Sequence, residues 1–415
     1  MSADLANAME VLQRLAVQIP DGVFGVERQM EIGKILAGTN AAEHLALRLH
    51  FERLLDREIE TNAADLAFGG FGGHGKIWYR TYGAMRPDPD MGTLECDQAG
   101  VLIQSILMEQ QRRQLYERRN LDFSYSLVRG DIIHRFRCDA YFDLDHCAVA
   151  IRAVQARIRP YKDLGFHHNV TKIMSLAHTK SGLTLITGIT GSGKSATLDS
   201  IVELNNTSVD GHIVIIAEPV EYVHRSNRCI IRHREVGRDV LSFKEGTIQS
   251  LRQNPDIIII GEMRDPDTIL TALEVTDSGH KVFSTLHTSS AVESLDRIIA
   301  EIPSIEQERV RNRLADVLRC VVSQKLVPSL DGKVILAKEV MLMTPSVRAA
   351  IKNNNTQEIY QMISEGGELG MITMEQDLRR LHGARRVSVD MAMNFANNKR
   401  RMEQLLSAGQ QSKVI

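Results

Sequence analysis

One short segment constrains the fold of this chain more than any other. The residues Gly188-Ile-Thr-Gly-Ser-Gly-Lys-Ser195 match the phosphate-binding pattern GxxxxGK[ST] in full, after an apolar run and before a helical stretch. Its glycines allow backbone N–H groups to wrap a phosphate, and the positive end of the following helix strengthens the attraction. Lys194 would neutralise the outer phosphates and Ser195 would bind Mg²⁺. The predicted nucleotide-binding residues are Gly188, Ile189, Thr190, Gly191, Ser192, Gly193, Lys194, Ser195 and Ala196.

The sequence around this motif predicts a parallel sheet. Four short apolar runs of strand length, rich in β-branched residues, alternate with helical stretches. Such runs are typical of parallel strands that are buried on both faces. From residue 305 onward the pattern is mainly helical, with a hairpin expected at Asp331–Gly332. The expected strands are Leu183–Thr187, Ile213–Ala217, Ile257–Ile260 and Val282–Thr285.

The length of 415 residues and the changes of pattern along the chain indicate several domains of an α/β protein. Residues 1–45 are predicted to form a helical extension and residues 46–158 a first domain of mixed α and β structure. Residues 159–169 contain Pro160 and Gly165 and are predicted to be a linker. The domain with the phosphate-binding loop is expected at 170–330, followed by a mostly helical region at 331–415.

Composition narrows the classes of function. The formal net charge of −2 argues against a protein whose main task is non-specific binding to nucleic acid. The five cysteines are scattered without a CxxC pair, so neither a disulfide framework nor a zinc site is expected. Charged residues interrupt the first twenty positions and apolar runs are short, which indicates neither a secretory signal nor a membrane span. We therefore expect a cytoplasmic protein.

Acidic residues after two predicted strands are candidates for chemistry on the nucleotide. Glu262 follows Ile257–Ile260, and the carboxyl ends of strands face the ligand crevice in open α/β sheets. It could orient or deprotonate the attacking water, the alternative being a solvated loop acid. Gly261 precedes it, where P-loop enzymes usually have a metal-binding Asp. We therefore expect Glu218 and Glu221 to contribute to catalysis, and Glu218 together with Ser195 to hold the metal.

Two histidines flank the next predicted strand. His280 precedes the strand and His287 follows it, within Ser284-Thr-Leu-His287-Thr288. An imidazole beside the nucleotide can report the loss of a phosphate by exchanging hydrogen bonds, whereas a lone histidine is more often structural. We predict that both act as sensors of the γ-phosphate. Asp265-Pro266, in contrast, predicts a helix N-cap followed by proline in the first turn.

Together these segments resemble the type II/IV secretion ATPase superfamily. The resemblance rests on the P-loop and on three further segments in family-like order and spacing: Ala217–His224, Gly261–Asp265 and Gly279–Arg297. Gly366–Met371 is similar to a C-terminal segment of the motors that retract type IV pili. The resemblance implies a PAS-like N-terminal domain, a RecA-like ATPase domain and a homohexameric ring that binds ATP and Mg²⁺.

The resemblance also implies further site residues and partners. Arg135 and Arg137 match arginines of the family's first domain, which can stabilise charge that develops on the γ-phosphate. Surface cross-strand pairs are the alternative for both. The implied function is the retraction of type IV pili, and so twitching motility. The motor would act on an inner-membrane platform protein from the cytoplasmic face of that membrane.

Two departures from the family leave alternatives open. Ala217-Glu218-Pro219 stands where the family usually has Glu-Asp-Pro, and Ser346–Ile351 lacks the usual Asn-Leu pair. A related ATPase for type IV secretion or pilus assembly is one alternative, although the chain lacks the four-cysteine zinc site of many assembly ATPases. A RecA-like nucleic-acid motor and a non-catalytic accessory scaffold are two others.

Overall fold

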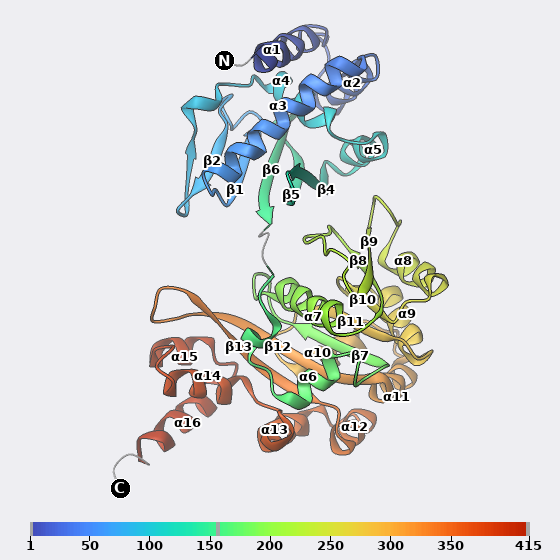
Figure 1. Ribbon diagram of the computed structural model, residues 1–415, viewed down its shortest axis with the longest axis vertical. Coiled ribbons are helices and arrows are strands. Elements are labelled where there is room, and N and C mark those ends of the chain that lie inside the picture. The colour runs from blue at the N-terminus through green and yellow to red at the C-terminus, as the bar shows by residue number, and fades with distance from the viewer. Residues whose placement is uncertain (1–2, 155–157, 412–415) are drawn as a thin grey trace. The chain divides into compact units, whose positions relative to one another are not determined.

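The computed structural model describes residues 3–154 and 158–411, which divide into two compact units (Figure 1). Unit 1 comprises Met1–Ala156 with Glu221–Val223, and unit 2 comprises Arg157–Val220 with His224–Ile415. Residues 155–157, near the predicted end of the first domain, lie outside the described residues.

Unit 1 is an antiparallel sheet with helices packed on it. Its strands follow the order β3-β2-β1-β6-β5-β4, and every neighbouring pair is antiparallel. The strands are β1 (Asp65–Gly69), β2 (Trp78–Thr81), β3 (Ala84–Pro87), β4 (Asn120–Arg129), β5 (Ile132–Asp143) and β6 (His146–Val154). The helices are α1 (Ala3–Ala16), α2 (Gly25–Ala37), α3 (Ala41–Glu60), α4 (Cys96–Ser105) and α5 (Glu109–Arg118).

The first 45 residues share the core of unit 1. Leu12 of α1 and Ile32 of α2 are fully buried in the same hydrophobic cluster as Phe51 of α3 and Leu66 of β1. The helix α3 begins at Ala41 because the Asn40 side chain caps it by accepting hydrogen bonds from two backbone N–H groups. Residues 1–45, which the sequence predicts to be a helical extension, therefore pack into the core of unit 1.

Unit 2 contains a seven-stranded sheet in the order β13-β12-β7-β11-β10-β8-β9. Neighbours are parallel except for the edge pair β12 and β13. The strands are β7 (Gly182–Thr187), β8 (Gly211–Ala217), β9 (Cys229–Glu235), β10 (Ile257–Ile260), β11 (Lys281–Leu286), β12 (Leu318–Pro328) and β13 (Val334–Leu342). All residues of β7, β10 and β11 are buried, as expected for parallel strands covered on both faces. The α/β fold class and the four expected strands are confirmed.

Helices cover both faces of this sheet and continue beyond it. The central ones are α6 (His168–Met174), α7 (Lys194–Ser208), α8 (Phe243–Ser250), α9 (Pro266–Asp277), α10 (Ala291–Ala300) and α11 (Gln307–Val317). The helix α9 begins where expected, because Asp265 accepts a hydrogen bond from Thr268 N at 2.8 Å and Pro266 occupies the first turn. The C-terminal helices are α12 (Pro345–Lys352), α13 (Ile359–Glu365), α14 (Met374–Gly383), α15 (Val389–Phe395) and α16 (Lys399–Gln411).

The region after residue 331 is not only helical. Val334–Leu342 forms β13, which completes the sheet through the expected hairpin, and its residues from Leu336 to Leu342 are buried. The helices α14 to α16 (red) lie together beside this hairpin in Figure 1. Lys325 of β12 binds the end of α15 and the segment that follows it, since its Nζ donates to Phe395 O at 2.8 Å and Asn397 Oδ1 at 2.6 Å. Asn397 in turn donates to Ser289 O at 3.0 Å.

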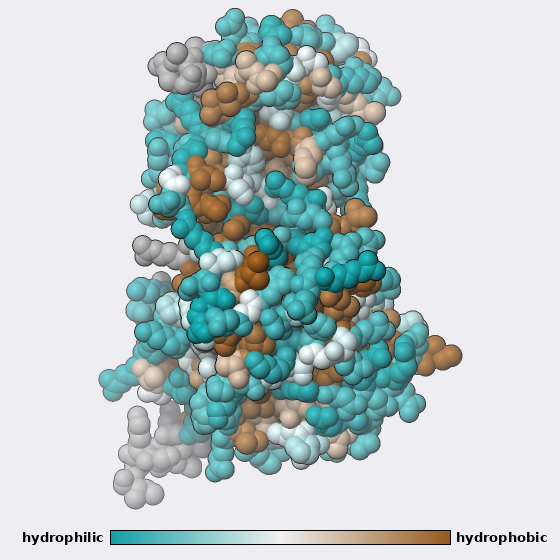
Figure 2. All heavy atoms as spheres, turned by 45° about the vertical axis from the view of Figure 1, so that its right-hand side comes forward, coloured by the Kyte–Doolittle hydropathy of each residue, from teal (hydrophilic) through white to brown (hydrophobic). Residues whose placement is uncertain are grey.

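The face of the protein drawn in Figure 2 is mainly polar. On the face drawn in Figure 2, hydrophilic residues predominate and hydrophobic ones occur in small groups. Among the described helices, none combines the length and the apolar character needed to cross a bilayer.

A buried lysine at the start of β11 should make stability depend on pH. Burial lowers the pKa of Lys281 to about 7, although Nζ donates to Ile173 O and Thr179 O. Between that value and its ordinary pKa of 10.5, the folded state binds fewer protons than the unfolded one, so stability rises with pH. From pH 7 to 9, the native protein should gain about 2 kcal/mol relative to Lys281→Met. Urea unfolding of both proteins at the two pH values measures this, and an unchanged difference would show that Lys281 stays charged when buried.

Candidate nucleotide site

The predicted phosphate-binding loop connects β7 to the N-terminus of α7. Gly188, Gly191 and Gly193 have φ angles of +151°, +78° and +85°, in a region that L side chains rarely adopt. The Lys194 side chain folds over the loop, and Nζ donates to Gly188 O at 2.8 Å and Ile189 O at 3.2 Å. The loop therefore curls around its own lysine ammonium, at the point where a phosphate would meet the positive end of α7.

Buried polar contacts hold the base of this loop. Gln324 of β12 is 1% exposed, and it donates to Ser192 O at 2.8 Å and accepts from Thr197 Oγ1 at 3.0 Å. Thr187, the last residue of β7, lies 2.8 Å from Ser323 through the two hydroxyl oxygens. Gln324 is a site residue that the motifs of the sequence do not predict. Its only signal is a polar Ser-Gln pair inside the apolar run of β12.

The predicted acids Glu218 and Glu262 come together at the carboxyl edge of the sheet. Ile216 of β8 pairs with Ile260 of β10, and each acid lies two residues after its member of this pair. Arg264 joins them: its Nη2 donates to Glu218 Oε2 at 2.8 Å, and its Nη1 lies 3.0 Å from Glu262 Oε1. Arg264 is not among the residues predicted from the sequence, although it follows Glu262 by two residues.

His287 connects this acidic pair to the phosphate-binding loop. Its Nε2 lies 3.4 Å from Glu262 Oε2, and its Nδ1 lies 3.5 Å from Thr190 Oγ1. The residue directly follows β11 and its side chain is 43% exposed. The structure thus brings Thr190, His287, Glu262, Arg264 and Glu218 into one chain of contacts.

His280 does not belong to this group, which corrects the prediction that both histidines lie beside the nucleotide. It precedes β11, whereas His287 follows it, so the two are about 23 Å apart along the strand at about 3.3 Å per residue. Its Nδ1 lies 3.0 Å from Ser278 Oγ and 3.3 Å from Val275 O, at the end of α9. His280 therefore lies at the amino end of β11, whereas the P-loop, Glu218 and Glu262 follow the carboxyl ends of the parallel strands.

The packing at Gly261 explains why no Asp precedes Glu262. A Cβ atom at this position would lie 3.2 Å from Ile216 O and 3.3 Å from Ala217 Cα of the neighbouring strand. A side chain there would therefore crowd β8.

The residues present fit Mg²⁺ bound largely through the nucleotide. No cluster of three His, Cys, Asp or Glu side chains suited to a metal occurs among the described residues. Ser195 is exposed in the first turn of α7, where its hydroxyl can bind Mg²⁺ beside the phosphates, and Ala196 follows it. Glu218 would have to share or release its contact with Arg264 to bind the metal.

The three other predicted residues lie outside this group of contacts. Arg135 is 8% exposed in unit 1, where it donates to Ser126 Oγ at 2.5 Å and Ser124 Oγ at 2.7 Å. Arg137 is half exposed on the same strand, 3.6 Å from Asp122 Oδ1 through Nη2. Glu221 is partly buried in the short segment that groups with unit 1. Arg137 therefore has the more accessible guanidinium of the two.

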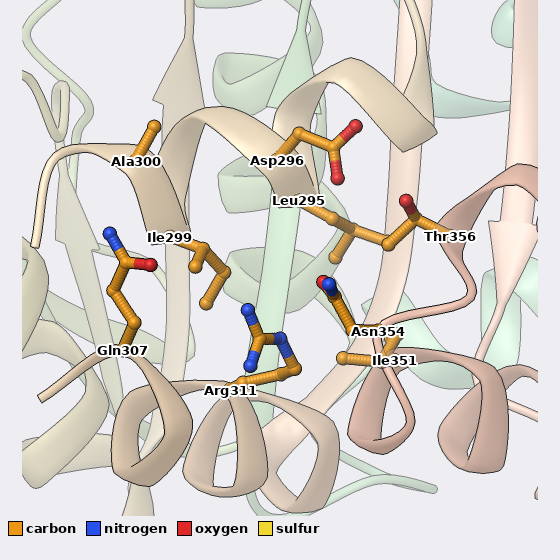
Figure 3. A pocket seen from close by; sticks show the side chains of 9 residues that line it. All are labelled: Leu295, Asp296, Ile299, Ala300, Gln307, Arg311, Ile351, Asn354 and Thr356. Carbon is orange, nitrogen blue, oxygen red and sulfur yellow. The ribbon is translucent and has the colours of Figure 1, made fainter. Parts of the chain in front are cut away.

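A cavity elsewhere in unit 2 is not part of this site. It has a volume of about 290 Å³ and lies between α10, α11 and the end of α12 (Figure 3). None of the predicted site residues lines it.

Comparisons with known proteins agree with this geometry. The family model described as type II/IV secretion system protein matches residues 41–382. The chain is 37% identical to the type IV pilus retraction ATPase PilT of Pseudomonas aeruginosa over 288 residues, 69% of this chain and 82% of that protein. It is 31% identical to the type IV pilus ATPase PilU of the same organism over 366 residues, 88% of this chain and 93% of that protein.

A solved structure supports the same assignment. The crystal structure of the pilus retraction motor PilT with bound ADP matches with a TM-score of 0.75 and 33% identity, covering 85% of this chain and 98% of that one. This protein therefore belongs to the type II/IV secretion system protein family, as the P-loop and the segments around it predicted.

Proposed function

We propose that this protein is an ATP-hydrolysing motor that drives the retraction of type IV pili, and so twitching motility. The observation that carries the proposal is the chain of contacts from Thr190 through His287 and Glu262 to Glu218, next to a complete P-loop. The similarity to PilT, which extends over most of both chains, supports pilus retraction as the work that this ATPase performs.

The chemistry assigned to the site is the transfer of the γ-phosphoryl group to water. Water attacks the γ-phosphorus, the bond to the bridging oxygen of ADP breaks, and Glu262 accepts the proton of the attacking water. Lys194 and the N–H groups of the loop bind the phosphates, and Ser195 with Glu218 would hold Mg²⁺, which neutralises charge on the phosphate oxygens. His287, between Glu262 and Thr190, is placed to respond when the γ-phosphate leaves.

Arg135, Arg137 and Glu221 are proposed to complete the site of an assembled homohexamer. In this proposal ATP binding closes the two units of a subunit about the predicted linker 159–169, and product release opens them. Arginines of unit 1 then add positive charge to the γ-phosphate as the units close. The ring would act on a platform protein of the inner membrane and dock at its cytoplasmic face.

Deletion of the gene in its host tests the proposed function. Loss of a retraction motor should leave cells with more surface pili than the parent and without twitching motility, because assembly continues unopposed. Pili counted by electron microscopy and colony spreading under agar measure this. The matched control restores the intact gene in one strain and the Glu262→Gln gene in another. Cells without pili would instead indicate a motor for pilus assembly. Cells with unchanged pili and motility would show that the protein does not act on pili.

An accessory pilus ATPase is the second candidate. The alignment with PilU covers more of this chain than the alignment with PilT, 88% against 69%. A deletion strain that loses motility only when a second retraction ATPase is also missing would favour this candidate. The rate of ATP turnover by the purified chain then separates a motor from a scaffold.

A further inference from the structure

Arg264 lies between the two acids that the proposed reaction uses. Its guanidinium reaches one carboxylate with each arm, at 2.8 Å to Glu218 and 3.0 Å to Glu262. The two acids are neighbours because they follow paired positions of β8 and β10. Without a cation between them, two carboxylates at adjacent strand ends would repel each other. Arg264 therefore balances their charge in the arrangement seen here.

This arrangement occupies both oxygens of Glu262. Oε1 faces Arg264, and Oε2 lies 3.4 Å from His287 Nε2. A general base must accept a proton from water on one of these oxygens, within hydrogen-bond distance. Each carboxylate oxygen can accept a second hydrogen bond, so Arg264 does not exclude water from Glu262 but competes with it for Oε1.

The side chain of Arg264 is free to move to a new partner. It is 60% exposed and stands in the short loop between β10 and α9, next to the capping residue Asp265. Exposed ion pairs contribute little to stability, so the contacts to the two acids are readily exchanged. A guanidinium prefers a phosphate that it can bind through two N–H groups.

We propose that Arg264 exchanges partners when nucleotide binds: it pairs with Glu218 and Glu262 in the empty site and with the terminal phosphate of a nucleoside triphosphate in the loaded one. This role rests on the proposed ATPase function. The exchange frees Oε1 of Glu262 only when the third phosphate is present. A diphosphate leaves Arg264 on the two acids, where its guanidinium continues to compete with water for Oε1 of Glu262.

The first test measures the binding of Mn²⁺ to the full-length, nucleotide-free protein by electron paramagnetic resonance. Arg264→Gln leaves the two carboxylates without their cation, so we expect it to bind Mn²⁺ about tenfold more tightly than the native protein. Arg264→Lys, which keeps the charge, should bind like the native protein. Arg309→Gln is the matched control, because Arg309 has similar exposure, 59%, and pairs with Glu306 on α11. Equal Mn²⁺ affinity of all four proteins would overturn the proposal.

The second test compares the affinities for a non-hydrolysable ATP analogue and for ADP. Arg264→Gln should reduce the preference for the analogue about tenfold and leave the affinity for ADP unchanged. An equal loss for both nucleotides, or an unchanged preference, would overturn the exchange. Matching circular dichroism and melting temperatures for all variants establish that they fold alike.

These readouts do not depend on turnover. A native chain that hydrolyses no ATP, but whose Arg264→Gln variant gives both expected shifts, would refute the proposed function and support the exchange. A chain that hydrolyses ATP and shows neither shift would support the function and refute the exchange.

Discussion

Glu262→Gln should lower kcat for ATP hydrolysis about 10²- to 10⁴-fold, the usual contribution of a general base, while nucleotide still binds. Glutamine has nearly the same shape but cannot take a proton from water. The position after β10 and the contacts to His287 and Arg264 keep the replaced side chain at the same place. Phosphate release by the purified protein measures kcat, and fluorescence of an ATP analogue measures binding.

Glu308→Gln is the matched control for this experiment. Glu308 is exposed on α11, and its replacement by glutamine also removes one negative charge, but outside the site. It should leave kcat within about twofold of the native value, as surface substitutions away from functional groups usually do. If Glu262→Gln kept native turnover, the base would be another group and the proposed mechanism would be wrong.

Gly188→Ala should abolish nucleotide binding, with a loss of affinity of more than about 100-fold, or about 2.7 kcal/mol. The added Cβ would lie 2.3 Å from Ser192 Oγ and 2.5 Å from the backbone oxygen of Gln324, and the φ angle of +151° strains any other residue. The serine side chain can turn away, but the backbone of β12 cannot. The loop must therefore shift away from the position in which its N–H groups bind phosphate.

Two further glycines serve as controls, because each has a positive φ angle but open space around its Cβ position. Gly191→Ala, in the same loop, should weaken binding only about tenfold through backbone strain. Gly332→Ala, in the β12–β13 hairpin, carries the same kind of strain and should bind nucleotide normally. Titration with a fluorescent ATP analogue ranks the three. An affinity of Gly188→Ala equal to that of Gly191→Ala would show that the contact with β12 does not hold the loop.

The elements nearest the P-loop could be predicted well from the sequence. The sequence predicts that the strand before the loop begins at Leu183, and in the structure it begins at Gly182. The bounds of Ile257–Ile260 agree with the prediction. Both strands are short apolar runs between polar residues, which makes their ends easy to place. The sequence pattern does not reveal β9, because it is an edge strand whose short apolar start, Cys229-Ile-Ile231, is followed by the polar residues Arg232-His-Arg-Glu235.

The contacts of the site were harder to predict than its residues. Glu262, Glu218 and His287 each follow a strand, which sequence pattern reveals. The role of Arg264 depends on which strands are neighbours and in which register, and no local pattern contains that information. His280 was predicted wrongly for the same reason. The direction of β11 within the sheet decides which end of this strand faces the nucleotide, and His280 lies at the other end.

The position of Lys325 limits how related proteins can exchange their C-terminal regions. It follows Gln324, which holds the phosphate-binding loop, and its ammonium binds the backbone of Phe395, the last residue of α15, and the Asn397 side chain. Asn397 returns to the backbone at Ser289, two residues after His287. A chimera joined at the hairpin near residue 331 would separate these partners unless the donor sequence supplied matching ones. Recombination should therefore keep Lys325 and Asn397 from one parent, whereas any residue at position 289 offers the same backbone oxygen.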